Sequence, residues 1–194
     1  ALEMDIINRC FSDLLTSDPI PPTSRLPFSK EEVKRVWEHH SDPWVDTVLI
    51  LLYSGWRISE LLNLKPEDID LQAGTMKGGT KTKAGKDRVV PIHSKIRTLI
   101  EARLAESGPR LISYNGRACS QTQYRIFWAD IMKALGMNHP PHECRHTFET
   151  QLDSAGANRK CIDLLMGHVS KDTGNRVYNH KTLDELKAAV EMIK

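Results

Sequence analysis

Two histidines and an arginine lie within five positions of the stretch PPHECRHTF, and their spacing suits two different chemistries. As His142-Glu143-x-x-His146, the stretch matches a zinc hydrolase pattern, in which two imidazoles one helical turn apart bind the metal and a carboxylate activates water. As His142-x-x-Arg145, it places an imidazole and a guanidinium on one helical face, where both can bind one phosphate. The rest of the sequence must distinguish these two interpretations.

The surroundings of this stretch favour phosphate over zinc. Two prolines directly precede His142 and place it in the first turn of a helix, whereas a zinc site of this type needs its histidines inside a longer helix. Arg145 adds a permanent charge within the motif. The usual third ligand is also missing, since residue 152 is Leu152 and no glutamate lies in residues 150–179. We therefore expect no metal or other cofactor, with a zinc hydrolase as the minor alternative.

Phosphoryl transfer without a metal needs fixed cations, a nucleophile and proton carriers, and the chain offers a residue for each task. Arg57 follows a glycine break at the start of a helix, where backbone N–H groups attract anions. Lys83 lies in the glycine-rich segment GGTKTKAGKDRVVPI, from which it could carry a proton to a leaving group. His168 follows Gly167 near a helix end. Tyr178, which has basic neighbours, is the candidate nucleophile.

The elements that must position these residues are mostly helical. A capping box at residues 29–32 begins a helix, the apolar stretch PWVDTVLILLYSG predicts a buried helix, and ISELLNL predicts a short one. Glycines between residues 69 and 92 indicate a small antiparallel sheet. Further helices are expected at 1–13, 94–107, 120–135, 141–154, 158–166 and 182–192. The predicted fold class is mostly α with one small antiparallel β-sheet.

Composition limits the class of protein. The net charge of +2 is small, but residues 77–97 hold seven basic residues against one acidic residue, a distribution that suits a phosphate backbone. The four cysteines form no Cys-x-x-Cys pair, which indicates reduced thiols in a cytosolic protein. The longest apolar run, residues 48–53, is far too short to span a membrane. We expect an intracellular protein that does not bind a membrane.

The order of these motifs resembles the catalytic domain of the tyrosine recombinase (phage integrase) family, most of all the integrases of mobile elements. The resemblance covers residues 29–194, which would form the catalytic domain, and residues 1–28 would be the end of a preceding domain plus a proline-rich linker. It rests on the motifs SGWRISELLNL, HECRHTF and LMGH and on the tyrosine in GNRVYNHK. Two small departures are Cys144, where an aliphatic residue is commoner, and one extra residue before the tyrosine. The functional positions of the family fall on Arg57, Lys83, His142, Arg145, His168 and Tyr178.

The resemblance implies a site-specific DNA recombinase that needs no metal. Tyr178 would attack a DNA phosphodiester and form a 3′-phosphotyrosine link, while Lys83 would protonate the leaving 5′-oxygen. Arg57 and Arg145 would hold the non-bridging oxygens and stabilise the charge of the transition state. A second 5′-hydroxyl would then reverse the reaction on a new partner strand.

The resemblance also implies roles for two histidines, and the general acid has alternatives. His142 would be the base for the tyrosine, and His168 would donate a hydrogen bond to the phosphate. Lys81 and Lys86, in the same segment, are alternatives to Lys83 as the general acid.

Three carboxylate and imidazole groups near the motifs have structural interpretations as well. Glu60 either braces Arg57 or faces solvent on its helix. Glu143 and His146 are expected to be packing or capping residues and not catalysts.

Double-stranded DNA is the implied partner, bound by a homo-tetramer of the full-length protein in the cytoplasm, in association with the nucleoid. DNA-bending or excision factors would be accessory partners. An apolar stripe in residues 182–194 would cover its own core or be exchanged with a neighbouring copy. A type IB topoisomerase and a non-catalytic DNA-binding relative are alternatives. Predicted phosphate contacts are Lys77, Lys81, Lys86 and Arg88, and Gln121, Gln123 and Arg125 either contact DNA or form a polar helix face.

Overall fold

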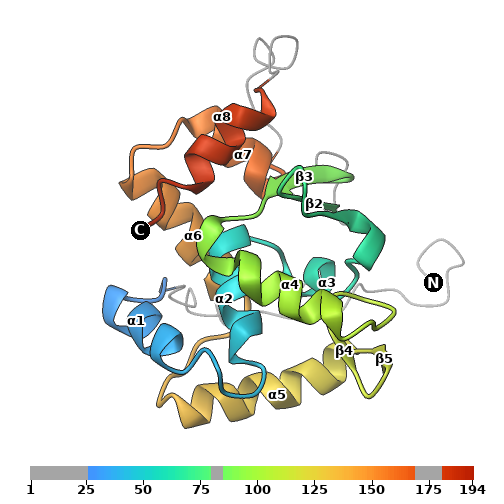
Figure 1. Cartoon of the computed structure of the whole chain (residues 1–194). Helices are drawn as coiled ribbons and strands as arrows, with labels where there is room; N and C mark the ends of the chain where they lie inside the picture. The colour runs from blue at the N-terminus through green and yellow to red at the C-terminus, as the bar shows by residue number, and fades with distance from the viewer. Residues whose placement is uncertain (1–25, 80–84, 169–180) are drawn as a thin grey trace, which may run out of the picture.

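A computed structural model describes residues 26–79, 85–168 and 181–194 of the chain (Figure 1). The described residues are mostly helical with small antiparallel sheets, as predicted, although the second sheet was not expected. The helix predicted at 1–13 lies outside them. The helices are α1 (Lys30–Glu38), α2 (Val45–Ser54), α3 (Ile58–Leu61), α4 (Arg97–Ala105), α5 (Gln121–Ala134), α6 (His142–Ser154), α7 (Arg159–Met166) and α8 (Leu183–Val190). The strands are β1 (Ile69–Asp70), β2 (Thr75–Gly78) and β3 (Arg88–Pro91) in one sheet, and β4 (Ser113–Tyr114) and β5 (Arg117–Ala118) in the other.

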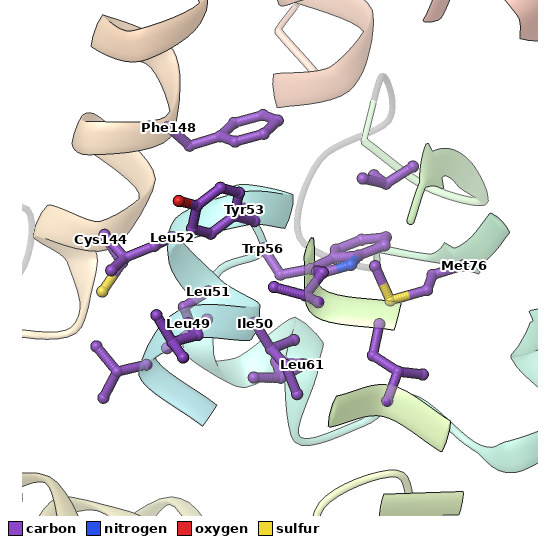
Figure 2. Close-up of a cluster of buried hydrophobic side chains, with 14 of the residues drawn as sticks. Leu49, Ile50, Leu51, Leu52, Tyr53, Trp56, Leu61, Met76, Cys144 and Phe148 are labelled. Carbon is purple, nitrogen blue, oxygen red and sulfur yellow. The ribbon is translucent and has the colours of Figure 1, made fainter. Parts of the chain in front are cut away.

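Helix α2 is the centre of the hydrophobic core. Every residue of the helix except Asp46 is buried, because its sequence VDTVLILLYS is apolar on all faces. Figure 2 shows Leu52 and Tyr53 facing Cys144 and Phe148 of α6, with Trp56 on the side of Met76. The burial predicted for this stretch is confirmed.

The end of α2 sets how closely α6 can approach. Gly55 ends the helix in the left-handed region with φ +64°, and a Cβ at this position would lie 2.3 Å from Cδ1 of Phe148. Glycine is therefore required both for the backbone angle and for the space that the phenyl ring occupies. The chain turns here directly into the segment that carries Arg57.

The three-stranded sheet confirms the predicted antiparallel sheet and has the order β1-β2-β3. Strands β2 and β3 pair in the register Gly78↔Arg88. Beyond this pair the backbone N–H of Asp87 donates to the carbonyl of Gly79 at 3.3 Å. Gly79 has φ +98°, and a Cβ there would lie 1.9 Å from the carbonyl oxygen of Gly85. Gly79 and Gly85, which form the base of the β2–β3 hairpin, therefore lie too close together for a side chain at residue 79.

The apolar stripe of the C-terminal segment covers its own chain in this structure. Helix α8 packs against α7 and β3 (Figure 1), and Leu186, Ala189 and Val190 are buried there. Beyond the helix, the ring of His93 is hydrogen bonded through Nε2 to the carbonyl of Ile193 at 2.9 Å. In the part of the chain that the structure describes, no helix combines the length and apolar character needed to cross a membrane.

Candidate active site

Arg57 is the N-terminal cap of the short helix α3, and Glu60 holds it from one turn further on. The backbone N–H of Arg57 donates to Oε2 of Glu60 at 3.0 Å, and its Nη1 donates to Oε1 at 3.0 Å. The Glu60 side chain is only 1% exposed, whereas that of Arg57 is 18% exposed. Of the two predictions for Glu60, the solvent-facing carboxylate is wrong, and the brace for Arg57 is the arrangement observed.

A second arginine shares the same carboxylate. Nη1 and Nη2 of Arg88 donate to Oε1 and Oε2 of Glu60 at 3.0 and 2.8 Å, a bidentate pair whose guanidinium carbon lies 4.0 Å from the centre of the Trp56 ring. Burial alone would raise the pKa of Glu60, but the hydrogen bonds from Arg88 and Arg57 outweigh it and lower the pKa to about 2. The Arg88 side chain is 4% exposed and directs both Nη atoms to the carboxylate of Glu60, so in this structure it binds a carboxylate, and the phosphate contact stays a prediction.

Arg145 comes from the buried face of α6 and is anchored by backbone carbonyls. Its Nη1 donates to the carbonyl of Gly55 at 2.7 Å, and its Nη2 donates to the carbonyl of Met166. Burial, and then the charges of Arg57 and Arg88, lower the pKa of Arg145 to about 10, so the guanidinium stays charged at neutral pH. These contacts join the end of α2 to the end of α7 around one fixed cation.

His168 lies beside this cation at the end of α7. Gly167 ends the helix with φ +63°, and the next residue brings Nε2 of His168 to 3.5 Å from Nη2 of Arg145. A guanidinium only donates hydrogen bonds, so Nε2 accepts in this contact. Burial and the charge of Arg145 lower the pKa of His168, which favours the neutral ring. An exposed, neutral imidazole therefore lies next to the buried guanidinium.

The turn at Gly167 also contacts the hairpin base. A Cβ on Gly167 would lie 2.8 Å from the Cα of Gly85 and 3.3 Å from Cδ of Arg88. The hairpin base, the Arg88 side chain and the segment leading to His168 are therefore packed without room for a side chain at residue 167.

His142 is the first residue of α6, as its preceding prolines predicted, and it is exposed. Its ring packs edge to face with that of His146 at 4.8 Å between centroids. The carboxylate of Glu143 points to another partner, because its Oε2 lies 2.5 Å from Nδ1 of His139. Within the ranges 26–79, 85–168 and 181–194, no three His, Cys, Asp or Glu side chains are grouped as metal ligands would be.

His139 was not identified from the sequence, and the residues around it give no signal for its role. Its Nε2 lies 3.0 Å from Oε1 of Glu32, and its ring stacks on Phe28 with 4.0 Å between centroids. Burial would lower the pKa of His139, but the hydrogen bonds with Glu143 and Glu32 raise it overall. This cluster fastens the start of α1 to the start of α6, so Glu143 has the packing role that its sequence position suggested.

The remaining predicted residues divide into exposed ones and ones without a described position. Lys77 and Lys86 are exposed on either side of the hairpin base. Gln121 and Arg125 are exposed on α5, while Gln123 completes a capping box with Ser120. Lys81, Lys83 and Tyr178 lie outside the described residues.

Comparison with known proteins gives the same family throughout. The model of the phage integrase family matches residues 28–185. The tyrosine recombinase XerA of Pyrococcus furiosus is 35% identical over 193 residues, which cover 93% of this chain and 66% of the relative. The chain thus spans about two thirds of the length of this relative and of its counterpart in Thermococcus kodakarensis.

Solved structures share the fold. The crystal structure of XerA recombinase has a TM-score of 0.68 and 26% identity, and the match covers 92% of this chain and 69% of that one. The integrase of transposon Tn1549, solved in complex with circular intermediate DNA, has a TM-score of 0.66 and 24% identity, with 96% and 72% covered. Because the family model matches most of the chain and the relatives share its fold, the chain belongs to the phage integrase family of tyrosine recombinases.

Proposed function

We propose that this chain cleaves and rejoins double-stranded DNA at specific sites through a covalent 3′-phosphotyrosine intermediate on Tyr178. Family membership supports this function, since the relatives named above are recombinases and an integrase and none of these is a topoisomerase. The convergence of Arg57, Arg145 and His168 from three distant parts of the sequence supports it independently.

The observation that carries the proposal is the charge of the site. Three guanidinium groups, those of Arg57, Arg88 and Arg145, act on the buried carboxylate of Glu60, so these four groups together carry a net charge of +2, and the group stays positive when the nearby carboxylate of Glu149 is counted. A pentavalent phosphorane-like transition state carries more negative charge than the phosphodiester from which it forms. Fixed cations from the chain itself can stabilise this added charge in a preorganised site.

The proposed reaction balances without a cofactor. The Tyr178 oxygen attacks phosphorus and passes its proton to His142, and Arg57 and Arg145 bind the non-bridging oxygens. The bond from phosphorus to the 5′-oxygen breaks, and the electron pair stays on that oxygen, which takes a proton from Lys83. A 5′-hydroxyl then attacks the phosphotyrosine and gives its proton to Lys83. The tyrosine oxygen leaves and recovers its proton from His142, so the phosphodiester and the tyrosine are both restored.

His168 would assist by binding the phosphate through its second ring nitrogen. Because Nε2 accepts from Arg145, the proton of the neutral ring is on Nδ1, which is then available as a donor. The pairing with Arg145 would thus fix both the position and the tautomer of this imidazole.

Binding of DNA and assembly on it belong to the same proposal. Lys77 and Lys86 would contact the phosphate backbone and make affinity depend on salt. A homo-tetramer and accessory DNA-bending or excision factors are proposed from the family resemblance. Exchange of α8 between copies would require release of the contacts that Ile193 and Leu186 make with their own chain.

The test is formation of a covalent adduct with nicked DNA. A pool of duplexes with random sequence around a nick is incubated with the chain in EDTA, and protein-linked DNA is recovered under denaturing conditions and sequenced. We expect an enriched site and a 3′ link to Tyr178. The Tyr178→Phe variant should bind the recovered duplex but form no adduct, and an adduct that persists in this variant contradicts the assignment of the nucleophile.

A further inference from the structure

Arg88 lies at the active site with both of its Nη atoms paired with a buried carboxylate. Its side chain is 4% exposed and donates hydrogen bonds to Glu60 and, at 3.5 Å, to the carbonyl of Gly85. We infer that Arg88 is a positioning residue for cleavage: it neutralises Glu60, so that the charge of Arg57 remains available to the phosphate. The inference rests on the proposed function and assigns Arg88 a task within the same site.

Arg57 and Arg88 share the carboxylate of Glu60. Each oxygen of Glu60 accepts one hydrogen bond from Arg57 and one from Arg88, at distances of 2.8 to 3.0 Å. Without Arg88, the buried carboxylate would have Arg57 as its guanidinium partner in this cluster, and the two charges would cancel. Arg57 would then be held by Glu60 and attract an anion less strongly. With Arg88 present, Glu60 can hold Arg57 in place while the cluster keeps its net positive charge.

The Arg88 side chain is held in this position by its neighbours on several sides. Its guanidinium stacks on Trp56, and its Cδ and Nη1 lie against the Gly167 turn and the hairpin base. In strand β3 the exposed side chain is that of Val89, while Arg88 on the neighbouring position is buried. Arg88 therefore lies on the same inward face of the strand as the core residue Val90, which is fully buried.

The test is a double-mutant cycle of Arg88→Met and Glu60→Gln. Each variant is tested for the rate of adduct formation in a single turnover on the duplex recovered from the random pool, for the dissociation constant on intact DNA, and for thermal unfolding. We expect Arg88→Met alone to slow cleavage at least about tenfold with less than about threefold change in the dissociation constant. In the Glu60→Gln background, the same substitution should change the rate by less than about threefold, because no negative charge remains to be neutralised.

Arg103→Met is the matched control. Arg103 is also buried, pairs bidentately with Asp46 at 2.6 and 2.7 Å, and stacks on Trp44. These partners lie at the start of α2, whereas Arg145 is anchored at the end of that helix. The Arg103→Met substitution should lower the unfolding temperature without slowing cleavage by the folded protein. Arg88→Lys, which keeps the charge, should recover much of the rate that Arg88→Met loses.

The outcomes separate the inference from the proposed function. Equal effects of Arg88→Met in both backgrounds, or a rate unchanged from that of the parent chain, overturn the inference alone. If Arg88→Met does not fold, Arg88→Lys and the double variant Glu60→Gln/Arg88→Met are measured instead. A double variant that cleaves far more slowly than Glu60→Gln alone overturns the inference. A parent chain that forms no adduct overturns the proposed function and the inference with it.

Discussion

Replacing Gly55 by alanine is expected to destabilise the protein by about 2–5 kcal/mol. The residue has φ +64°, and a side chain in the left-handed region costs about 1–2 kcal/mol. The new Cβ would also lie 2.3 Å from the ring of Phe148, and such overpacking in a core costs about 1–3 kcal/mol. Relief of this clash would displace the backbone of residue 55, whose carbonyl accepts a hydrogen bond from Nη1 of Arg145 at 2.7 Å. Cleavage should therefore slow as well.

Gly74→Ala separates the two contributions. Gly74 has φ +65°, but its added Cβ would meet no described atom within 4 Å, so only the backbone cost of about 1–2 kcal/mol applies. Urea unfolding of the two variants should therefore differ by about 1–3 kcal/mol at equal slope. Equal destabilisation by both substitutions would refute the packing argument, and unchanged cleavage by Gly55→Ala would refute the link to Arg145.

Three further predictions concern the charges of the site. Arg145→Lys should slow cleavage about a hundredfold or more in single-turnover assays with little loss of DNA binding, because an ammonium cannot bind two carbonyls and a phosphate in the geometry of the guanidinium. The pKa of Glu60 is lowered from 4.5 to about 2, so its stabilising effect is present above about pH 4.5 and is lost as pH falls toward 2; Glu60→Gln should remove this part of the pH dependence of urea unfolding. Lys77→Ala should weaken DNA binding uniformly across sequences and reduce the slope of log K against log salt by about 1 in fluorescence anisotropy titrations.

Elements governed by near neighbours in the chain were predictable. The capping box from Ser29 to Glu32 forms as expected, since the serine hydroxyl and the glutamate carboxylate reach backbone groups only three residues away. The apolar run before Gly55 forms the buried helix, although its first residue is Val45 and not Pro43. Glycine positions likewise indicated the hairpin.

Burial of charge was not predictable from the same information. Lys77 and Arg88 belong to one basic stretch, yet the first is exposed and the second is buried against Glu60, which is 28 residues away in the sequence. The β4–β5 hairpin was missed because its strands are two residues each and carry no alternating pattern.

The sequence by itself determined the family, the order of the functional motifs and most of the helices, because these depend on residue types and on spacings along the chain. Only the tertiary structure decided which charged groups meet. It placed Arg145 beside His168 and paired Glu60 with two arginines, and within this single chain it packed α8 on α7 and β3. The physical reason is that an ion pair or a packed face requires two groups to be close in space. Segments far apart in the sequence come close together only when the chain folds.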